Sequence, residues 1–101
     1  MEFQGYSSLS HLLGSYLHQD WCDEFTNTDE AVTAFVQGEG TNAASGAVQN
    51  ISALLTDPRF HQDPEGVLRG LGCYYDPASE GQTPKEWLLD VQRILQQCLR
   101  K

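Results

Sequence analysis

Two copies of one tripeptide are the first feature of the sequence that could support chemistry: His18-Gln19-Asp20 and His61-Gln62-Asp63. Imidazole nitrogens and carboxylate oxygens are common zinc ligands. Within each copy, however, the two candidate ligands are two residues apart, whereas side chains that share a helix face are three or four apart. The copies would therefore form a metal site only if they meet in space. The alternative reading is structural: His18 ends a helix, and Asp63 caps the start of another.

Other catalytic arrangements are missing from the sequence. No serine, cysteine or histidine follows the strand, nucleophile, helix pattern of G-x-S-x-G. Gly38-x-Gly40 has no preceding strand and no phosphate-binding lysine, so it predicts a helix end and not a nucleotide loop. Adjacent acids such as Asp23 and Glu24 show no sign of the burial that catalytic carboxylates need. We expect a protein that is not an enzyme and needs no cofactor; the alternative is a small metal-dependent hydrolase using His18, Asp20, His61 and Asp63.

The charge is unevenly distributed along the chain. Fourteen acidic and six basic residues give a formal net charge of -8. Residues 1–58 contain eight acids and no lysine or arginine, whereas residues 59–101 contain six acids and six bases. Such a field repels nucleic acid and anionic membranes, and it attracts cationic partners at rates that fall as salt rises. Acidity can also serve solubility alone. The charge therefore argues against direct nucleic acid or membrane binding and allows a cationic protein partner.

Cysteine usage and hydropathy indicate the compartment. The three cysteines, Cys22, Cys73 and Cys98, are widely spaced and form no C-x-x-C pair, which predicts buried, reduced thiols. The first residues contain no basic segment followed by an apolar run, and no stretch approaches the roughly 18 apolar residues of a membrane helix. We expect a cytoplasmic protein.

Apolar residues recur at spacings of three and four, without convincing alternation at a spacing of two. This pattern predicts an all-α fold, a compact single-domain bundle of about five helices formed by residues 1–101. Helices are expected at about 8–18, 29–37, 43–56, 64–71 and from 84 to the last residues, with a loop at 72–82. The expected N-caps are Ser7 or Ser8, Thr28, Asp63, and Thr83, the last in a capping box with Glu86.

One stretch resembles the start of the contact-dependent growth inhibition (CDI) immunity proteins of the CdiI family: Leu12-Leu13-Gly14-Ser15-Tyr16-Leu17-His18-Gln19-Asp20-Trp21, followed by Asp29-Glu30-Ala31-Val32 and Phe35. The family signature includes a tyrosine, an apolar residue and His-Gln-Asp-Trp before a helix rich in Asp, Glu and Ala. The resemblance extends to the terminal Trp87-Leu88 helix but not to residues 60–82. It implies a cytoplasmic protein that binds the toxic C-terminal domain of a delivered effector, without catalysis. We expect a monomer in a 1:1 complex with that toxin domain.

The resemblance and the charge together suggest where the toxin binds. Many delivered toxins are nucleases with cationic clefts, which an acidic surface can occupy in place of phosphates. A motif shared by proteins that meet different toxins is more plausibly structural, so Tyr16, His18 and Trp21 are assigned mainly to the fold. Trp21 and Phe25, four residues apart, are expected to pack on the core. The expected toxin-binding residues are Asp20, Asp23, Glu24, Asp29, Glu30 and Glu39. A helical adaptor or transcriptional co-regulator is a further alternative.

Overall fold

The computed structural model describes residues 6–18 and 21–100. This part of the chain forms seven α-helices and one 3-10 helix, without a strand, which confirms the all-α prediction. The elements are α1 (Ser7–Tyr16), α2 (Trp21–Glu24), α3 (Thr28–Glu39), α4 (Thr41–Leu55), α5 (Pro58–Gln62), α6 (Pro64–Gly70), η1 (Pro77–Glu80) and α7 (Pro84–Leu99). The five predicted helices correspond to α1, α3, α4, α6 and α7. The short helices α2 and α5 were not predicted.

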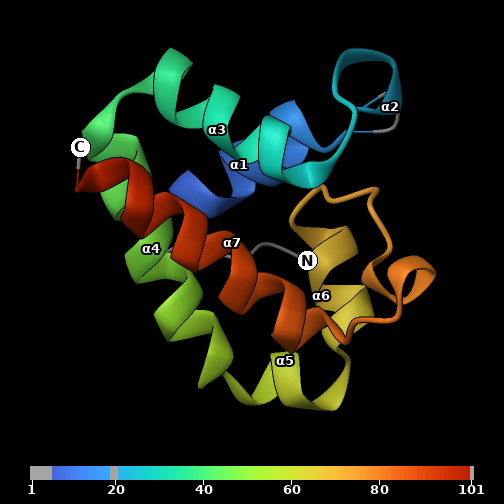
Figure 1. The fold of residues 1–101 in the computed structure, drawn as a ribbon. Helices are drawn as coiled ribbons and strands as arrows, with labels where there is room; N and C mark the ends of the chain where they lie inside the picture. Colours follow the sequence, from blue (N-terminus) through green and yellow to red (C-terminus); the bar gives the residue numbers. More distant parts are fainter. Residues whose placement is uncertain (1–5, 19–20, 101) are drawn as a thin grey trace.

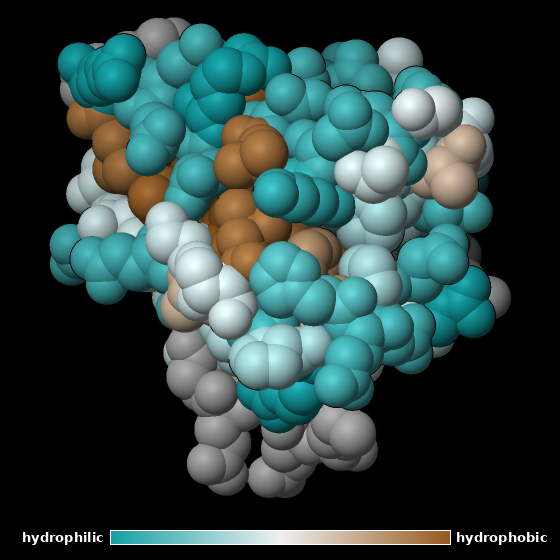
Figure 2. Space-filling view, turned by 90° about the horizontal axis from the view of Figure 1, so that it is seen from below, coloured by the Kyte–Doolittle hydropathy of each residue, from teal (hydrophilic) through white to brown (hydrophobic). Residues whose placement is uncertain are grey.

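The four longest helices form the body of the molecule. α7 crosses the front in Figure 1 and packs against α4 and α3, while α1 lies behind and contacts the same two helices. α5 and α6 close one end of this body, and α2 lies at a corner beside the start of α3. Seen from below, the surface is mostly polar, and hydrophobic atoms show in two narrow stripes in the left half of the view (Figure 2).

The apolar faces of the helices meet in one core. On α4 the buried side chains are Ala44, Ala47, Ile51 and Leu54. On α7 they are Trp87, Leu88, Val91, Ile94 and Leu95. These side chains join buried residues of α1, α3 and α6 in a single cluster. Burial of this apolar surface is the main force that holds the helices together.

Local capping signals explain where several helices begin. The Asp63 carboxylate accepts a hydrogen bond from the Gly66 amide at 3.1 Å, which confirms it as the N-cap of α6. Thr83 and Glu86 form the predicted capping box of α7, with bonds of 2.9 and 3.1 Å. In both cases a proline follows the cap, and its fixed φ suits the first helical position.

Two predicted caps were wrong. The N-cap of α3 is Asn27, whose side chain accepts from the Glu30 amide at 2.9 Å. Thr28 is instead buried, and its hydroxyl accepts a bond from the Trp87 indole nitrogen at 3.4 Å. A buried indole N–H usually has an acceptor, and Thr28 provides it here. At α1 the cap position is Tyr6, with no side-chain capping bond, and Ser7 and Ser8 already lie within the helix.

The cysteines differ in their surroundings. Cys73 is buried, and loss of solvation raises the pKa of its thiol to about 11. Cys98 is partly buried, whereas Cys22 is exposed on α2, so the prediction of burial was wrong for Cys22. None of the helices in the described ranges has the length and apolar character to cross a membrane.

Candidate functional site

Aromatic side chains hold the short helix α2 against the body. The Trp21 ring lies edge-on to Tyr75, with centroids 5.5 Å apart, and Tyr75 in turn lies 5.1 Å from Trp87. Just beyond α2, the Phe25 ring stacks on Tyr16 at 6.3 Å. Trp21 and Phe25 are partly buried and pack against the core, as predicted. The residues between them, 22–24, are exposed, so α2 presents its polar side to solvent.

Four of the predicted acidic residues lie on α2 and the first turn of α3. Asp23, Glu24, Asp29 and Glu30 are all exposed. Negative charge is favourable near a helix N-terminus, where amide groups point outward, which suits Asp29 and Glu30 to their positions. The face of α3 that carries these two residues borders an open hollow of about 350 Å³. The structure thus brings these four carboxylates to one corner of the molecule. Asp20 lies outside the described residues.

The four carboxylates differ in their partners. Glu24 lies 3.4 Å from the His18 imidazole, and Glu30 accepts a hydrogen bond from the Thr26 amide at 2.9 Å. For Asp23 and Asp29, the described chain offers no side-chain hydrogen bond or ion pair. These two carboxylates are therefore the most available for an outside partner.

Glu39, the sixth predicted residue, is part of a contact that supports the fold. It is the last residue of α3, where a negative charge is unfavourable to the helix dipole. Two groups of α1 compensate: the His11 imidazole nitrogen lies 3.2 Å from its carboxylate, and the Tyr16 hydroxyl donates to it at 3.1 Å. The bond from His11, and then that from Tyr16, lowers the pKa of Glu39. Glu39 therefore links α3 to α1 in addition to carrying charge.

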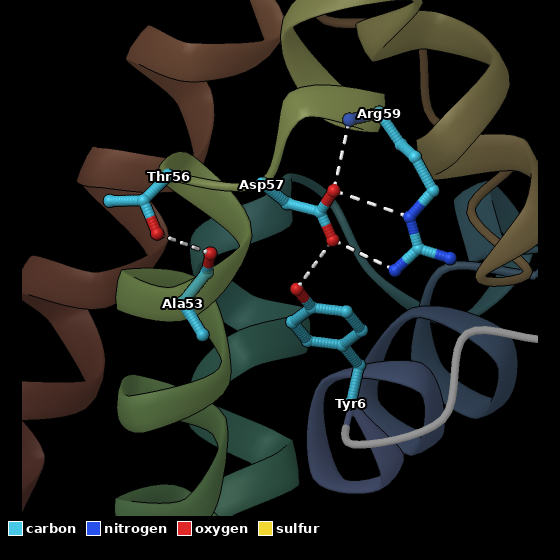
Figure 3. Close-up of polar contacts among 5 residues, drawn as sticks. All are labelled: Tyr6, Ala53, Thr56, Asp57 and Arg59. Atoms are coloured by element: carbon cyan, nitrogen blue, oxygen red, sulfur yellow. Dashed lines mark hydrogen bonds and ion pairs between the residues drawn. The ribbon is translucent and has the colours of Figure 1, made fainter.

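Asp57 is also engaged within the molecule (Figure 3). The Arg59 guanidinium donates to its carboxylate at 2.8 and 3.2 Å, and the Tyr6 hydroxyl donates at 2.9 Å. These bonds hold the pKa of Asp57 well below its usual range, with the Arg59 side chain as the main cause. This carboxylate is therefore occupied by its own neighbours.

Three residues of the alternative metal site have other contacts. His18 lies beside Glu24, the His61 ring lies edge-on to Phe60, and Asp63 caps α6. Across residues 6–18 and 21–100, no group of three or more histidine, cysteine or acidic side chains is arranged to hold a metal ion. Asp20, the fourth residue of this alternative, lies outside the described residues.

Comparison with known proteins identifies the family. A family model described as CdiI immunity protein matches residues 5–95, which span α1 to α6 and most of α7. The match also covers residues 60–82, which the resemblance in the sequence did not include. Searches of curated proteins and of solved structures found no match. The matched range includes the aromatic residues that pack α2 against the body and the acidic residues exposed on α2. The chain belongs to the CdiI immunity protein family, whose members neutralise a cognate toxin protein by binding it.

Proposed function

We propose that this immunity protein neutralises its toxin by placing the acidic corner formed by α2 and the start of α3 against a cationic surface of the toxin domain. We define the acidic corner as Asp23, Glu24, Asp29 and Glu30. One observation carries the proposal: four exposed carboxylates lie on two consecutive helices, within a stretch of 58 residues that has no lysine or arginine. We further propose that the protein acts in the cytoplasm, as a monomer in a 1:1 complex.

The chemistry of the acidic corner suits a nuclease toxin. A nuclease cleft is lined by cations that bind substrate phosphates, and carboxylates can take the place of those phosphates. A field of one sign also steers the two proteins together and raises the association rate, increasingly so at low salt. Asp20 directly precedes α2 in the sequence, and we include it in the toxin-facing surface. Glu39 is proposed as a secondary contact because its carboxylate is shared with His11 and Tyr16.

The test is the association rate with a catalytically inactive form of the cognate toxin domain, measured by stopped flow over a range of salt concentrations. Asp23→Asn with Glu24→Gln, and separately Asp29→Asn with Glu30→Gln, should each slow association by roughly three- to tenfold at low salt. Each pair should also make the rate less dependent on salt. Glu39→Gln is measured alongside, together with its thermal unfolding, since this side chain also supports the fold.

A matched control separates local from overall charge. Glu86→Gln with Asp90→Asn removes the same two charges from α7, while the new amide oxygens can still accept the bonds from the Thr83 amide and Gln82. This variant should associate nearly as fast as the wild type. If the acidic-corner variants kept the wild-type rate and full protection of cells, the acidic corner would not be the interface, although toxin binding itself would stand.

A further inference from the structure

One aromatic side chain outside the acidic corner is held out into solvent. In the loop after α6, Cys73 and Tyr75 are 3% and 8% exposed, whereas Tyr74 between them is 63% exposed. Leu89 is the other exposed large hydrophobic residue in the part of the chain that the structure describes, at 44%. A single exposed apolar residue is common on protein surfaces, so exposure alone indicates no function. The surroundings of Tyr74 provide the further evidence.

The backbone around Tyr74 is fixed on both sides. Its amide donates to the Leu17 carbonyl at 2.9 Å, and the Cys73 amide donates to the Leu68 carbonyl at 3.0 Å. The buried Tyr75 ring is held by Trp21 and Trp87, and its hydroxyl donates to Glu80 at 2.6 Å. The exposed ring therefore projects from a rigid frame. A side chain presented in this way loses little conformational entropy when it binds.

A pocket of about 330 Å³ lies beside Tyr74, between α6 and the segment 73–77. Its charged lining consists of Glu65, Arg69 and Asp76. One carboxylate oxygen of Asp76 accepts from the Ala78 amide at 3.1 Å, which leaves the other oxygen available. Within the described ranges, the side chains of Glu65 and Arg69 form no ion pair. The pocket thus brings together two acidic residues, one arginine and Tyr74.

The loop that lines the pocket is attached beside α2. The Tyr74 amide binds Leu17, a few residues before α2, and the adjacent Tyr75 ring contacts Trp21 of α2 itself. In Figure 1 the yellow to orange segment after α6 runs just below α2. A partner that covers the exposed acids of α2 and extends along this loop would also meet Tyr74.

We infer that Tyr74 and this pocket form an anchor site for one lysine or arginine side chain of the toxin, an inference that rests on the proposed function. Tyr74 offers its ring face to the cation, an interaction that strengthens when water is excluded. Glu65 and Asp76 accept the N–H groups of the same cation in charge-assisted hydrogen bonds. The excess of carboxylates over guanidinium in the pocket favours a cationic occupant over an anionic one.

The first test compares variants of Tyr74 in binding to the inactive toxin domain. Tyr74→Ala should raise Kd by roughly 10- to 100-fold, mainly through faster dissociation, because buried aromatic anchors dominate interface energies. Tyr74→Phe retains the ring and should bind within about threefold of wild type. Leu89→Ala removes the other exposed apolar side chain and should leave Kd unchanged. Thermal unfolding should be unaltered in all three variants, because both side chains are exposed.

The second test gives the sign of the occupant's charge. Glu65→Gln should weaken binding severalfold, and Arg69→Gln should strengthen it, because a cation is attracted by the first group and repelled by the second. If Glu65→Gln strengthened binding and Arg69→Gln weakened it, the occupant would be anionic and the inference would be overturned. Equal losses for Tyr74→Ala and Leu89→Ala would also overturn it.

Binding to the inactive toxin domain distinguishes failure of the acidic corner from failure of the anchor site. If the acidic-corner variants slow association while Tyr74→Ala binds normally, the anchor site is wrong and the proposed function stands. If the acidic-corner variants have no effect while the Tyr74 and charge variants behave as expected, the acidic corner fails and the anchor site stands. If the wild-type protein does not bind the toxin domain, both are wrong.

Discussion

Asp57 joins three parts of the chain through a single carboxylate. It binds Tyr6, which precedes α1, and it caps α5 by accepting from the Arg59 amide at 2.9 Å. It also binds the Arg59 guanidinium (Figure 3). These partners favour the ionised form, so the pKa of Asp57 is lower in the folded than in the unfolded chain. The stability that it contributes is therefore present at neutral pH and is lost as the carboxylate is protonated.

We predict that Asp57→Asn lowers the melting temperature by several degrees at pH 7, with a difference from wild type that narrows as the pH falls below about 4. Asparagine can still cap α5, but it has no charge to pair with Arg59. The measurement is thermal unfolding by circular dichroism from pH 2 to pH 7. Tyr6→Phe, which removes one of the bonds, should cause a smaller loss. A difference that stays constant over this range would show that ionisation of Asp57 does not matter.

At the scale of elements, α1 packs closely on the turn that follows α6. Gly72 has a φ of +99°, and a Cβ placed on it would lie 2.9 Å from the Cα of Gly14 in α1. Backbone atoms cannot move aside as a side chain can. A Cβ on Gly14, in contrast, would meet the Leu71 carbonyl oxygen at an ordinary 3.8 Å. The contact therefore needs glycine at residue 72 but not at residue 14.

Two alanine substitutions should consequently have opposite effects. Gly72→Ala should reduce the free energy of unfolding by about 1–3 kcal/mol, because it adds backbone strain and a steric clash. Gly14→Ala should increase it by about 0.5–1 kcal/mol, because alanine restricts the unfolded chain and favours a helix. Urea unfolding measures both values. Two changes of the same sign would contradict this account of the contact.

The elements that could be predicted are those with local signals. The capping box at Thr83 and the Asp63-Pro64 pair lie within a few residues of the helices that they start. The four-residue helix α2 is too short to show a periodic pattern, and it is held by Tyr75, which is remote in sequence. The choice of Asn27 over Thr28 as cap likewise depends on a distant residue, Trp87.

The candidate site was predictable only in part. The exposure of the charged residues on α2 and α3 follows from their type, because ionised side chains are costly to bury. The pocket beside Tyr74 could not be predicted, since it exists only where α6 and the following loop are folded together. The sequence predicted only a loop at 72–82, in which nothing distinguishes the exposed Tyr74 from the buried Tyr75.

At the scale of the whole molecule, the charge asymmetry of the sequence divides the helices into two groups. The helices α1 to α4 come from the part without lysine or arginine, whereas the basic residues lie in the later part. Some of these bases already face acids, as Arg59 faces Asp57 and Arg93 faces Asp90 at 3.5 Å. An approaching cationic protein would therefore be attracted most strongly by the first half of the chain.

We predict that the molecule unfolds as one unit, because its buried residues form one cluster that joins the four longest helices and α6. Far-ultraviolet circular dichroism and tryptophan fluorescence should show the same urea midpoint, with an m value of about 1–3 kcal/mol/M. Trp21 and Trp87 report on α2 and on α7, respectively. A fluorescence transition at a lower urea concentration than the loss of helix would show that part of the structure unfolds separately.

The position of Tyr75 has a consequence for how long the protein survives in a cell. Its ring contacts Trp21 beneath the acidic corner and Trp87 in the core, so a toxin bound over α2 and Tyr74 would also restrain the body of the molecule. Binding to the folded form alone adds about 2.7 kcal/mol of stability when free partner is at a hundredfold excess over Kd. Proteases act mainly on opened molecules, so the toxin-bound form would be degraded more slowly than the free form. The supply of immunity protein would then rise with the amount of toxin that enters the cell.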